Sequence, residues 1–203
     1  MKHPAVILIG GAPGVGKTTL GIALAARLSF ASLSIDDLMS AAQAVTTPET
    51  HPELHIMRTL PYLDYFTNTS VDQLKADAEV QHAATWPIVE RVIRKHAAAG
   101  PGIAIDGWHL RPRRVAGLDL ENVRSVWLVA APSVLESRER SNPDWLRDSA
   151  DPERMLQNFL ARSLWYNDLI KNEAGEAGMN VLVQSGAASV DQLCTAAVAK
   201  VAG

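Results

Sequence analysis

The stretch VILIGGAPGVGKTTLGIAL, residues 6–24, constrains the fold of this 203-residue chain more than any other segment. The apolar run from Ala5 to Ile9 has the composition of a strand buried on both faces. Apolar residues at helical spacing follow in residues 17–28, so the glycine-rich segment between them is a tight loop from a strand to a helix. Strands and helices continue to alternate along the chain, which predicts a parallel sheet covered by helices on both faces.

The remaining elements are expected from composition and capping signals. Ser70 opens a long helix that runs toward Ala99, because the SVDQ pattern lets Ser70 and Gln73 exchange capping hydrogen bonds. Pro87 inside that helix predicts a kink or a restart. Residues 46–69 are too long for a simple connection, so we expect them to be functional, mobile or partly helical. Further strands are expected at 32–35, 103–106, 124–131 and 180–183, and further helices at 36–45 and 132–140 and from 151 and 189 onward.

Composition limits the kinds of protein that this chain can be. Its length and its 47% hydrophobic and 20% charged residues suit one globular domain over residues 1–203. A net charge of −3 disfavours a general nucleic-acid or membrane surface. Cys194 is the single cysteine, expected to be buried and inert, and it excludes an internal disulfide. No apolar run reaches the length of a membrane span, so a cytoplasmic location is expected.

Residues 11–18 fit the spacing of glycine, any four residues, glycine, lysine, then serine or threonine. Glycines allow positive φ angles and close approach to an anion, and the helix that begins near Lys17 adds the positive end of its dipole. The pattern predicts a cradle for nucleotide phosphates, in which Lys17 reaches the β- and γ-phosphates and Thr18 ligates Mg²⁺. Gly21 falls inside the helix, where we expect it to permit close packing. The expected nucleotide-binding residues of the loop are Gly11, Ala12, Pro13, Gly14, Val15, Gly16, Lys17, Thr18 and Thr19.

The segment GAPGVGKTT resembles the phosphate loop of P-loop kinases of the nucleoside-monophosphate-kinase-like group. This resemblance implies a P-loop NTPase three-layer α/β sandwich, with a five-stranded parallel sheet in the order 2-3-1-4-5 and a helical lid. In that group a magnesium-associated acidic residue ends the third strand, and Asp106 stands at the corresponding place in IAIDG.

The stretch SIDDLM, Ser34 to Met39, bears on the group that receives the phosphoryl. In many small-molecule kinases of this kind an aspartate just past the second strand orients and deprotonates the acceptor hydroxyl. Asp36 is the candidate base and Asp37 the reserve, although an aspartate here also suits a helix N-cap. Related kinases often carry arginine where Met39 stands, which predicts a different acceptor pocket.

The stretch IDGWHLRPRR, residues 105–114, resembles in part the D-G-x-P-R element of adenylate kinases. It is more similar to the E-G-x-H-L-x-P stretch of 2-phosphoglycerate kinases. Arg111, Arg113 or Arg114 could bind an anionic acceptor group with a guanidinium fork, or could form a solvated basic loop. His109 could contact the acceptor or make ordinary structural hydrogen bonds.

A series of arginines in and around residues 138–155 corresponds to the lid of the resembled group. Arg138 is the candidate for stacking on adenine, and Arg147 and Arg154 are the candidates for neutralising phosphate charge. Interleaved aspartates leave surface ion pairs as the alternative. The resemblance further implies that residues 184–189 pack against adenine, although a plain turn also explains them. The series consists of Arg138, Arg140, Arg147, Arg154 and Arg162.

These features predict an enzyme, an ATP- and Mg²⁺-dependent kinase that phosphorylates a hydroxyl of a small anionic metabolite. Residues 37–100 are expected on the acceptor side. A nucleoside monophosphate kinase is the alternative enzyme, and a nucleotide-dependent regulatory ATPase or switch is the alternative of another class. The expected partners are the acceptor, ATP and Mg²⁺, without nucleic acid or membrane, and the oligomeric state is not predicted.

Overall fold

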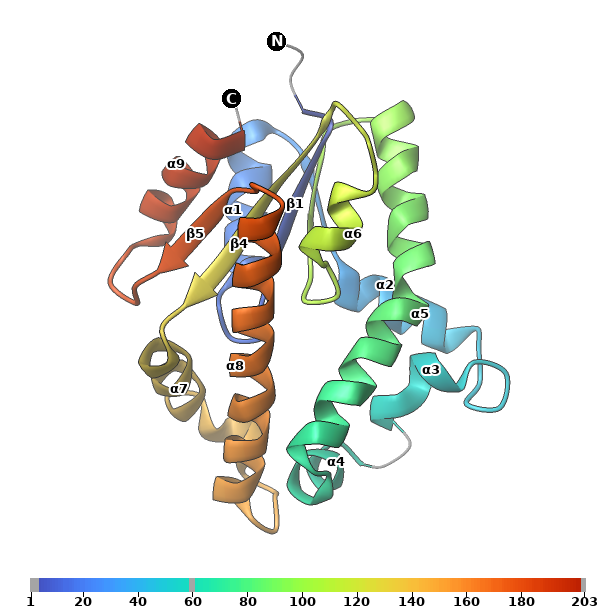
Figure 1. Ribbon diagram of the computed structural model, residues 1–203, viewed down its shortest axis with the longest axis vertical. Coiled ribbons are helices and arrows are strands. Elements are labelled where there is room, and N and C mark those ends of the chain that lie inside the picture. The colour runs from blue at the N-terminus through green and yellow to red at the C-terminus, as the bar shows by residue number, and fades with distance from the viewer. Residues whose placement is uncertain (1–3, 59–60, 202–203) are drawn as a thin grey trace.

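A computed structural model describes residues 4–58 and 61–201, and these residues build a five-stranded sheet (Figure 1). Every neighbouring pair of strands is parallel and the order is β2-β3-β1-β4-β5, as expected. The predicted strand positions are correct to within one or two residues. The strands are β1 (Val6–Gly11), β2 (Ala31–Ser34), β3 (Ile103–Asp106), β4 (Val123–Ala130) and β5 (Val181–Gln184).

Helices cover both faces of the sheet, which gives three layers (Figure 1). One face packs against α1 (Lys17–Leu28) and α9 (Val190–Val201). The other packs against α5 (Val71–Ala98), α6 (Pro112–Ala116) and much of α8 (Pro152–Glu176).

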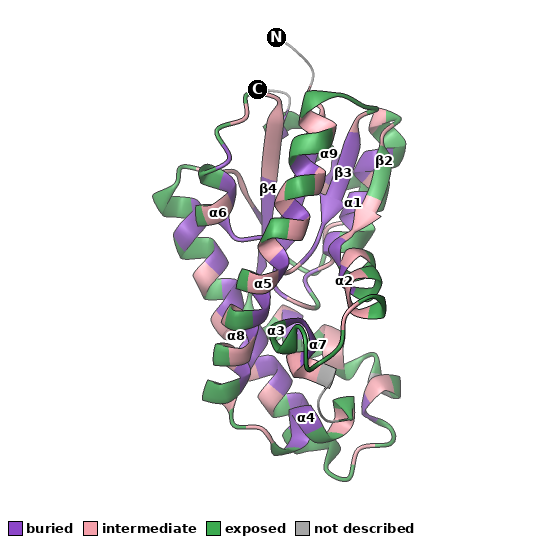
Figure 2. Cartoon of the chain, turned by 90° about the vertical axis from the view of Figure 1, so that its right-hand side faces the viewer, coloured by how far each residue is buried: buried purple, intermediate pink, exposed green. Residues whose placement is uncertain are grey.

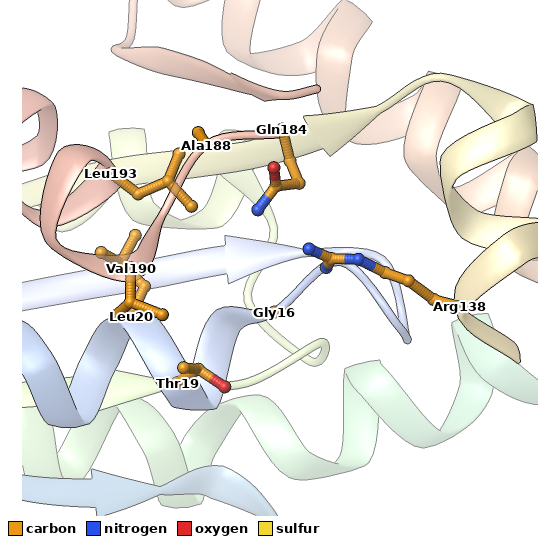
Figure 3. A pocket seen from close by; sticks show the side chains of 8 residues that line it. All are labelled: Gly16, Thr19, Leu20, Arg138, Gln184, Ala188, Val190 and Leu193. Carbon is orange, nitrogen blue, oxygen red and sulfur yellow. The ribbon is translucent and has the colours of Figure 1, made fainter. Parts of the chain in front are cut away.

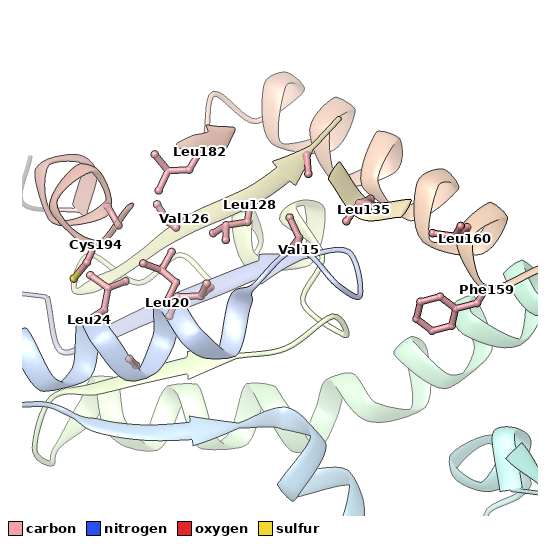
Figure 4. Close-up of a cluster of buried hydrophobic side chains, with 14 of the residues drawn as sticks. Val15, Leu20, Leu24, Val126, Leu128, Leu135, Phe159, Leu160, Leu182 and Cys194 are labelled. Atoms are coloured by element: carbon pink, nitrogen blue, oxygen red, sulfur yellow. The ribbon is translucent and has the colours of Figure 1, made fainter. Parts of the chain in front are cut away.

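Alternate side chains of β1 enter two different cores. Ile7 and Ile9 join the cluster on the α1 and α9 face, while Val6 and Leu8 join the opposite cluster. Both sets are fully buried, which explains why this strand reads as an unbroken apolar run. Figure 4 shows the first cluster, in which Cys194 lies near Leu24, and Cys194 is buried as expected.

The long helix α5 begins where its capping pattern predicts, because the Ser70 hydroxyl oxygen accepts a hydrogen bond from the Gln73 backbone N–H at 3.2 Å. The helix continues through Pro87, so the restart considered for this position does not occur. Buried residues form a stripe on the inner sides of α5 and α8, and the outer sides are exposed (Figure 2).

The segment at 46–69 is partly helical in its described residues. It contains α3 (Pro52–His55), the 3₁₀ turn η1 (Ile56–Arg58) and α4 (Tyr62–Asn68), while positions 59 and 60 lie outside the described residues. Helix α2 (Ile35–Ala44) precedes this segment. Helix α4 lies beside the first turns of α8, and α8 also packs against α7 (Pro132–Arg140) and the 3₁₀ turn η2 (Pro143–Leu146) (Figure 1). The expected acceptor side and lid therefore meet beyond the carboxyl ends of the strands, where ligands of parallel sheets bind.

Candidate active site

The glycine-rich loop between β1 and α1 has the backbone shape that a phosphate cradle needs. Gly14 has φ 78° and Gly16 has φ 96°, in the left-handed region that favours glycine. The Lys17 ammonium is buried and donates a hydrogen bond to the Ala12 carbonyl at 2.8 Å. Burial lowers the pKa of Lys17 to about 8, against the opposing attraction of Asp36, Asp106 and Glu139.

A hydroxyl and a carboxylate meet beside this loop in the arrangement expected for Mg²⁺. Asp106 ends β3, pairs in register with Ile9 of β1 and is 2% exposed. The Thr18 hydroxyl donates a hydrogen bond to its carboxylate at 2.7 Å. Burial raises the pKa of Asp106, while the Thr18 hydrogen bond and the Lys17 charge lower it. These two oxygen ligands fit Mg²⁺, which is typically held by few protein groups together with waters and substrate phosphates.

A pocket of about 400 Å³ opens on the phosphate loop from the acceptor side. Its wall combines the loop, one carboxylate, one guanidinium, and aromatic or sulfur-containing side chains. The lining residues are Pro13, Gly14, Lys17, Thr18, Asp36, Met57, Tyr62, Phe66, Trp108 and Arg162.

Asp36 is the carboxylate of this pocket, and its side chain does not cap the helix. Ser34 is the N-cap of α2, and its hydroxyl accepts a hydrogen bond from the Asp36 backbone N–H at 3.3 Å. Removal from water raises the pKa of the Asp36 carboxyl, while Lys17 opposes and Asp37 adds to this change. Asp37 is not among the lining residues, so Asp36 is the one of the two carboxylates that faces the pocket.

Arg162 of α8 is the guanidinium of this pocket and is 3% exposed. It lies 4.6 Å from the ring centre of Phe66, 4.8 Å from Trp108 and 5.2 Å from Phe159. Its Nε atom has no hydrogen-bond partner in the described part of the chain, and the Met57 sulfur is 3.9 Å from Nη1. Burial lowers the pKa of Arg162 to about 10, so the side chain is still a cation at neutral pH. The faces of three aromatic rings surround this cation.

A second pocket, of about 180 Å³, lies on the other side of the phosphate loop (Figure 3). Arg138 and Gln184 point toward the same space beside Gly16. Arg138 also donates a hydrogen bond to the Gly14 carbonyl at 3.1 Å. The lining residues are Gly16, Thr19, Leu20, Arg138, Gln184, Ala188, Val190 and Leu193.

The arginines expected to bind the acceptor lie elsewhere, which corrects the expected geometry. Arg111 is 1% exposed and forms ion pairs with Glu79 of α5 and Glu173 of α8. Its Nε atom donates a hydrogen bond to Oε2 of Glu173 at 3.2 Å. Arg113 pairs with the same two carboxylates, and Arg114 donates to the His82 carbonyl. None of the three lines the pocket, because Glu79 and Glu173 bind the guanidinium groups of Arg111 and Arg113 and the His82 carbonyl binds that of Arg114.

His109 is buried as well, and neither of its ring nitrogens has a partner among the described residues. The ordinary structural hydrogen bonds considered for it are therefore not present in the described structure. Burial, with Lys17 and Arg162 adding to it, lowers the pKa of His109 to about 3.

The lid arginines Arg147 and Arg154 lie outside both pockets. Arg147 pairs with Asp144, and both side chains are exposed. The Arg154 backbone N–H donates to the capping carboxylate of Asp151 at 3.1 Å. In this conformation Arg147 therefore forms a surface ion pair, which is the alternative considered for the lid arginines.

The sequence patterns gave no reason to place Arg162, Trp108, Tyr62, Phe66 and Met57 in one pocket. Phe159 and Arg162 are spaced so that an aromatic ring and a guanidinium lie on one side of α8. This spacing is the sequence pattern that could have indicated their contact. The remaining ring contacts come from distant segments of the chain.

Comparisons with known proteins agree with this architecture. A curated 2-phosphoglycerate kinase from Pyrococcus furiosus is 32% identical over 162 residues, which cover 79% of this chain and 52% of that protein. One from Pyrococcus horikoshii is 30% identical over 113 residues, covering 55% of this chain and 38% of that protein. The chain thus spans about half or less of the length of these relatives. No protein-family model matches it.

Solved structures resemble the whole chain. A gluconokinase from Sinorhizobium meliloti 1021 has a TM-score of 0.57 at 17% identity, covering 100% of this chain and 94% of that one. A sugar kinase from Janibacter sp. HTCC2649 has a TM-score of 0.60 at 17% identity, covering 98% and 95%. A shikimate kinase from Acinetobacter baumannii has a TM-score of 0.54 at 15% identity, covering 97% and 92%.

Within the described residues, none of the helices combines the length and apolar character needed to span a bilayer.

At the sequence identities of 15–17% given above, the similarity to solved structures concerns the fold. The chain therefore has the fold of P-loop kinases that act on small molecules, and its sequence is similar to 2-phosphoglycerate kinases, as the GAPGVGKTT and DGWHLRP stretches predict.

Proposed function

We propose that this protein transfers the γ-phosphoryl group of ATP, bound with Mg²⁺, to a hydroxyl group of a small anionic metabolite. One observation carries the proposal. A single pocket joins Lys17 and Thr18 of the phosphate loop to the Asp36 carboxylate and to the buried guanidinium of Arg162. In this proposal Lys17 and Thr18 form the phosphate site, Asp36 is the base and Arg162 is the anion site. One small molecule bound in the pocket could contact all of them.

The nucleotide would lie across the phosphate loop. Its adenine would occupy the second pocket, against Arg138 and Gln184, and its phosphates would receive the backbone N–H groups of the loop. Thr18 and Asp106 would hold Mg²⁺, which when bound neutralises charge on the phosphate oxygens.

Asp36 would orient the acceptor hydroxyl and take its proton. The acceptor oxygen then bonds to the γ-phosphorus as the bond from that phosphorus to the ADP oxygen breaks. Lys17 stabilises the negative charge that passes to the leaving oxygen. The raised pKa of Asp36 suits a proton acceptor.

Arg162 would bind the anionic group of the acceptor. A desolvated guanidinium without a carboxylate partner binds an incoming anion more strongly than an exposed one does. On the nucleotide side, closure of the lid would bring Arg147 and Arg154 toward the phosphates, since neither lines either pocket in this conformation.

An acceptor panel with γ-labelled ATP tests the proposal. The panel contains 2-phosphoglycerate, gluconate, shikimate and AMP, and we expect labelled product with an anionic acceptor other than AMP. Efficient labelling of AMP would favour the nucleoside monophosphate kinase. Steady hydrolysis without transfer to any acceptor would favour the regulatory ATPase.

A further inference from the structure

Two histidines without hydrogen-bond partners in the described part of the chain lie buried beside the 400 Å³ pocket that contains Asp36 and Arg162. We call this pocket the acceptor pocket. His82 of α5 is 0% exposed and His109 of the loop after β3 is 4% exposed, and their ring centres are 4.9 Å apart. All four ring nitrogens lack a partner in the described part of the chain.

Both imidazoles are neutral, because their surroundings oppose protonation. Burial lowers the pKa of His82 well below its usual value, and His109, Arg111, Arg114 and Arg162 add to this change. The pKa of His109 falls for the same reason. A neutral imidazole offers one donor and one acceptor, which matches a hydroxyl group and does not match an anion.

A buried polar atom without a partner costs about 1–3 kcal/mol. Four such atoms in one cluster therefore indicate that partners come from outside the chain, as water or as ligand. Phenylalanine at either position would avoid this cost, and the chain carries imidazoles instead.

Trp108 connects the two histidines to the acceptor pocket. Its ring centre lies 4.3 Å from that of His82 and 4.9 Å from that of His109, and Trp108 also lines the pocket. The Arg162 guanidinium lies 4.8 Å from the Trp108 ring on the pocket side. Because both imidazoles are buried, a ligand in the pocket reaches them only if a neighbouring side chain such as Trp108 moves.

We infer that His82 and His109 form a polar extension of the acceptor pocket that binds neutral hydroxyl groups of the acceptor. The inference rests on the proposed function. Together with Arg162, it assigns the acceptor to polyhydroxylated molecules with one anionic group, rather than to molecules with two anionic groups and a single hydroxyl.

Two matched pairs of acceptors test this chemistry. Gluconate is compared with 6-hydroxyhexanoate, and ribitol 5-phosphate with 5-hydroxypentyl phosphate. The members of each pair share the anion and the terminal hydroxyl and differ in the internal hydroxyls. We expect kcat/KM to be about tenfold or more higher for the hydroxylated member of at least one pair, and the pair that responds identifies the anion as carboxylate or phosphate.

Histidine variants link this preference to the two imidazoles. His82→Phe and His109→Phe should reduce the preference within the responding pair several-fold, leave the KM for ATP unchanged and retain the folded state. His96→Phe is the matched control, since His96 lies on α5 near Pro101, before the start of β3 and away from the phosphate loop.

A binding measurement separates this inference from the proposed function. In protein labelled with ¹⁵N at histidine, the hydroxylated probe should shift the ring resonances of His82 and His109, and its hydroxyl-poor partner should not. The absence of a shift with every hydroxylated probe, or a higher kcat/KM for 2-phosphoglycerate than for both polyols, would overturn the inference. Absence of phosphoryl transfer would count against the kinase, while the resonances would still decide whether the imidazoles bind hydroxyls.

Discussion

The guanidinium of Arg162 is held in the protein interior by the rings of Phe66, Trp108 and Phe159. Arg162→Met would remove a buried charge that has no carboxylate partner among the described residues. Such a change leaves stability unchanged or raises it. We expect the KM of the acceptor to rise about tenfold or more, with the KM for ATP unchanged. Steady-state kinetics with each substrate varied in turn checks this.

Arg91→Met is the control for that experiment, because Arg91 is exposed on α5. A rise in the KM for ATP alone, or equal effects of the two variants, would contradict the role of Arg162.

Sequence patterns predicted some of these residues and could not predict others. The proposed roles of Lys17 and Thr18 follow from local spacing, because a phosphate loop builds its cradle from consecutive residues. The roles of Arg111 and Arg162 depend on distant partners. Glu79 and Glu173 lie 32 and 62 residues from Arg111 along the chain, so no local pattern shows that it is neutralised while Arg162 is not.

At the scale of elements, the spacing between α1 and β3 sets the place of Asp106. A Cβ atom at Gly21 would lie 3.3 Å from the Cβ and the Oδ1 atoms of Asp106, which confirms the close packing expected there. We expect Gly21→Ala to displace the carboxylate and to raise several-fold the Mg²⁺ concentration that gives half-maximal activity. A Mg²⁺ titration of the initial rate measures this.

Gly175→Ala provides the matched control within a helix, because a Cβ atom there would meet nothing within 4 Å. It should stabilise the protein by roughly 0.5–1 kcal/mol and leave the Mg²⁺ dependence unchanged. An unchanged Mg²⁺ dependence in both variants would show that Gly21 does not position Asp106.

The ion pairs of Arg111 with Glu79 and Glu173 join α5 and α8 to the loop after β3. Removing one partner of a buried ion pair leaves a buried charge behind, so Arg111→Met should lower the free energy of unfolding by about 3 kcal/mol. Denaturant titration checks this. Arg94→Met breaks a more exposed pair with Glu90 and should cost well under 1 kcal/mol. Similar costs for the two variants would rule out a stabilising role for the buried pairs.

Element positions were predictable where caps and periodicity agree. Ser70 opens α5, as its capping pattern predicts, and α8 begins at the predicted place, directly after its N-cap Asp151. The segment at 46–69 gave no such signal, since α3 and α4 are short and depend on contacts with α5 and α8.

At the scale of the whole molecule, His82 and His109 make stability depend on pH. Their pKa values are lowered in the folded state, so the unfolded state binds more protons below about pH 6.5. The contribution of the two neutral imidazoles to the free energy of unfolding is complete above that pH, and it is lost as the pH falls. At pH 5 the loss is roughly 2 kcal/mol for each imidazole.

The double variant His82→Phe/His109→Phe isolates this contribution. Asp36 and Asp106 have raised pKa values and change stability in the opposite direction, and they are retained in the variant. The difference in unfolding free energy between pH 7.5 and pH 5 should therefore shrink relative to the wild type. An unchanged difference would show that the imidazoles titrate normally in the folded protein.

The strand order of the sheet was predictable through resemblance and not through periodicity. Hydrophobic patterns place each strand, but they do not say that β3 lies between β2 and β1. That order brings Asp106 beside the phosphate loop and Asp36 to the next strand end. The pocket follows from the topology of the whole sheet.

In the proposed reaction, Asp36 activates an acceptor hydroxyl in front of a nucleotide held by the phosphate loop. Asp36→Asn removes the base while keeping the size of the side chain. We expect phosphoryl transfer to fall by about 10²-fold or more, with the Kd for ATP changed less than about threefold. Asp168→Asn, an exposed position on α8, is the matched control.

The most direct test is the single-turnover rate of transfer from γ-labelled ATP to the acceptor identified in the panel, measured in wild-type, Asp36→Asn and Asp168→Asn proteins with ATP saturating. We expect loss of transfer in Asp36→Asn alone. Transfer at the wild-type rate in Asp36→Asn would contradict this expectation.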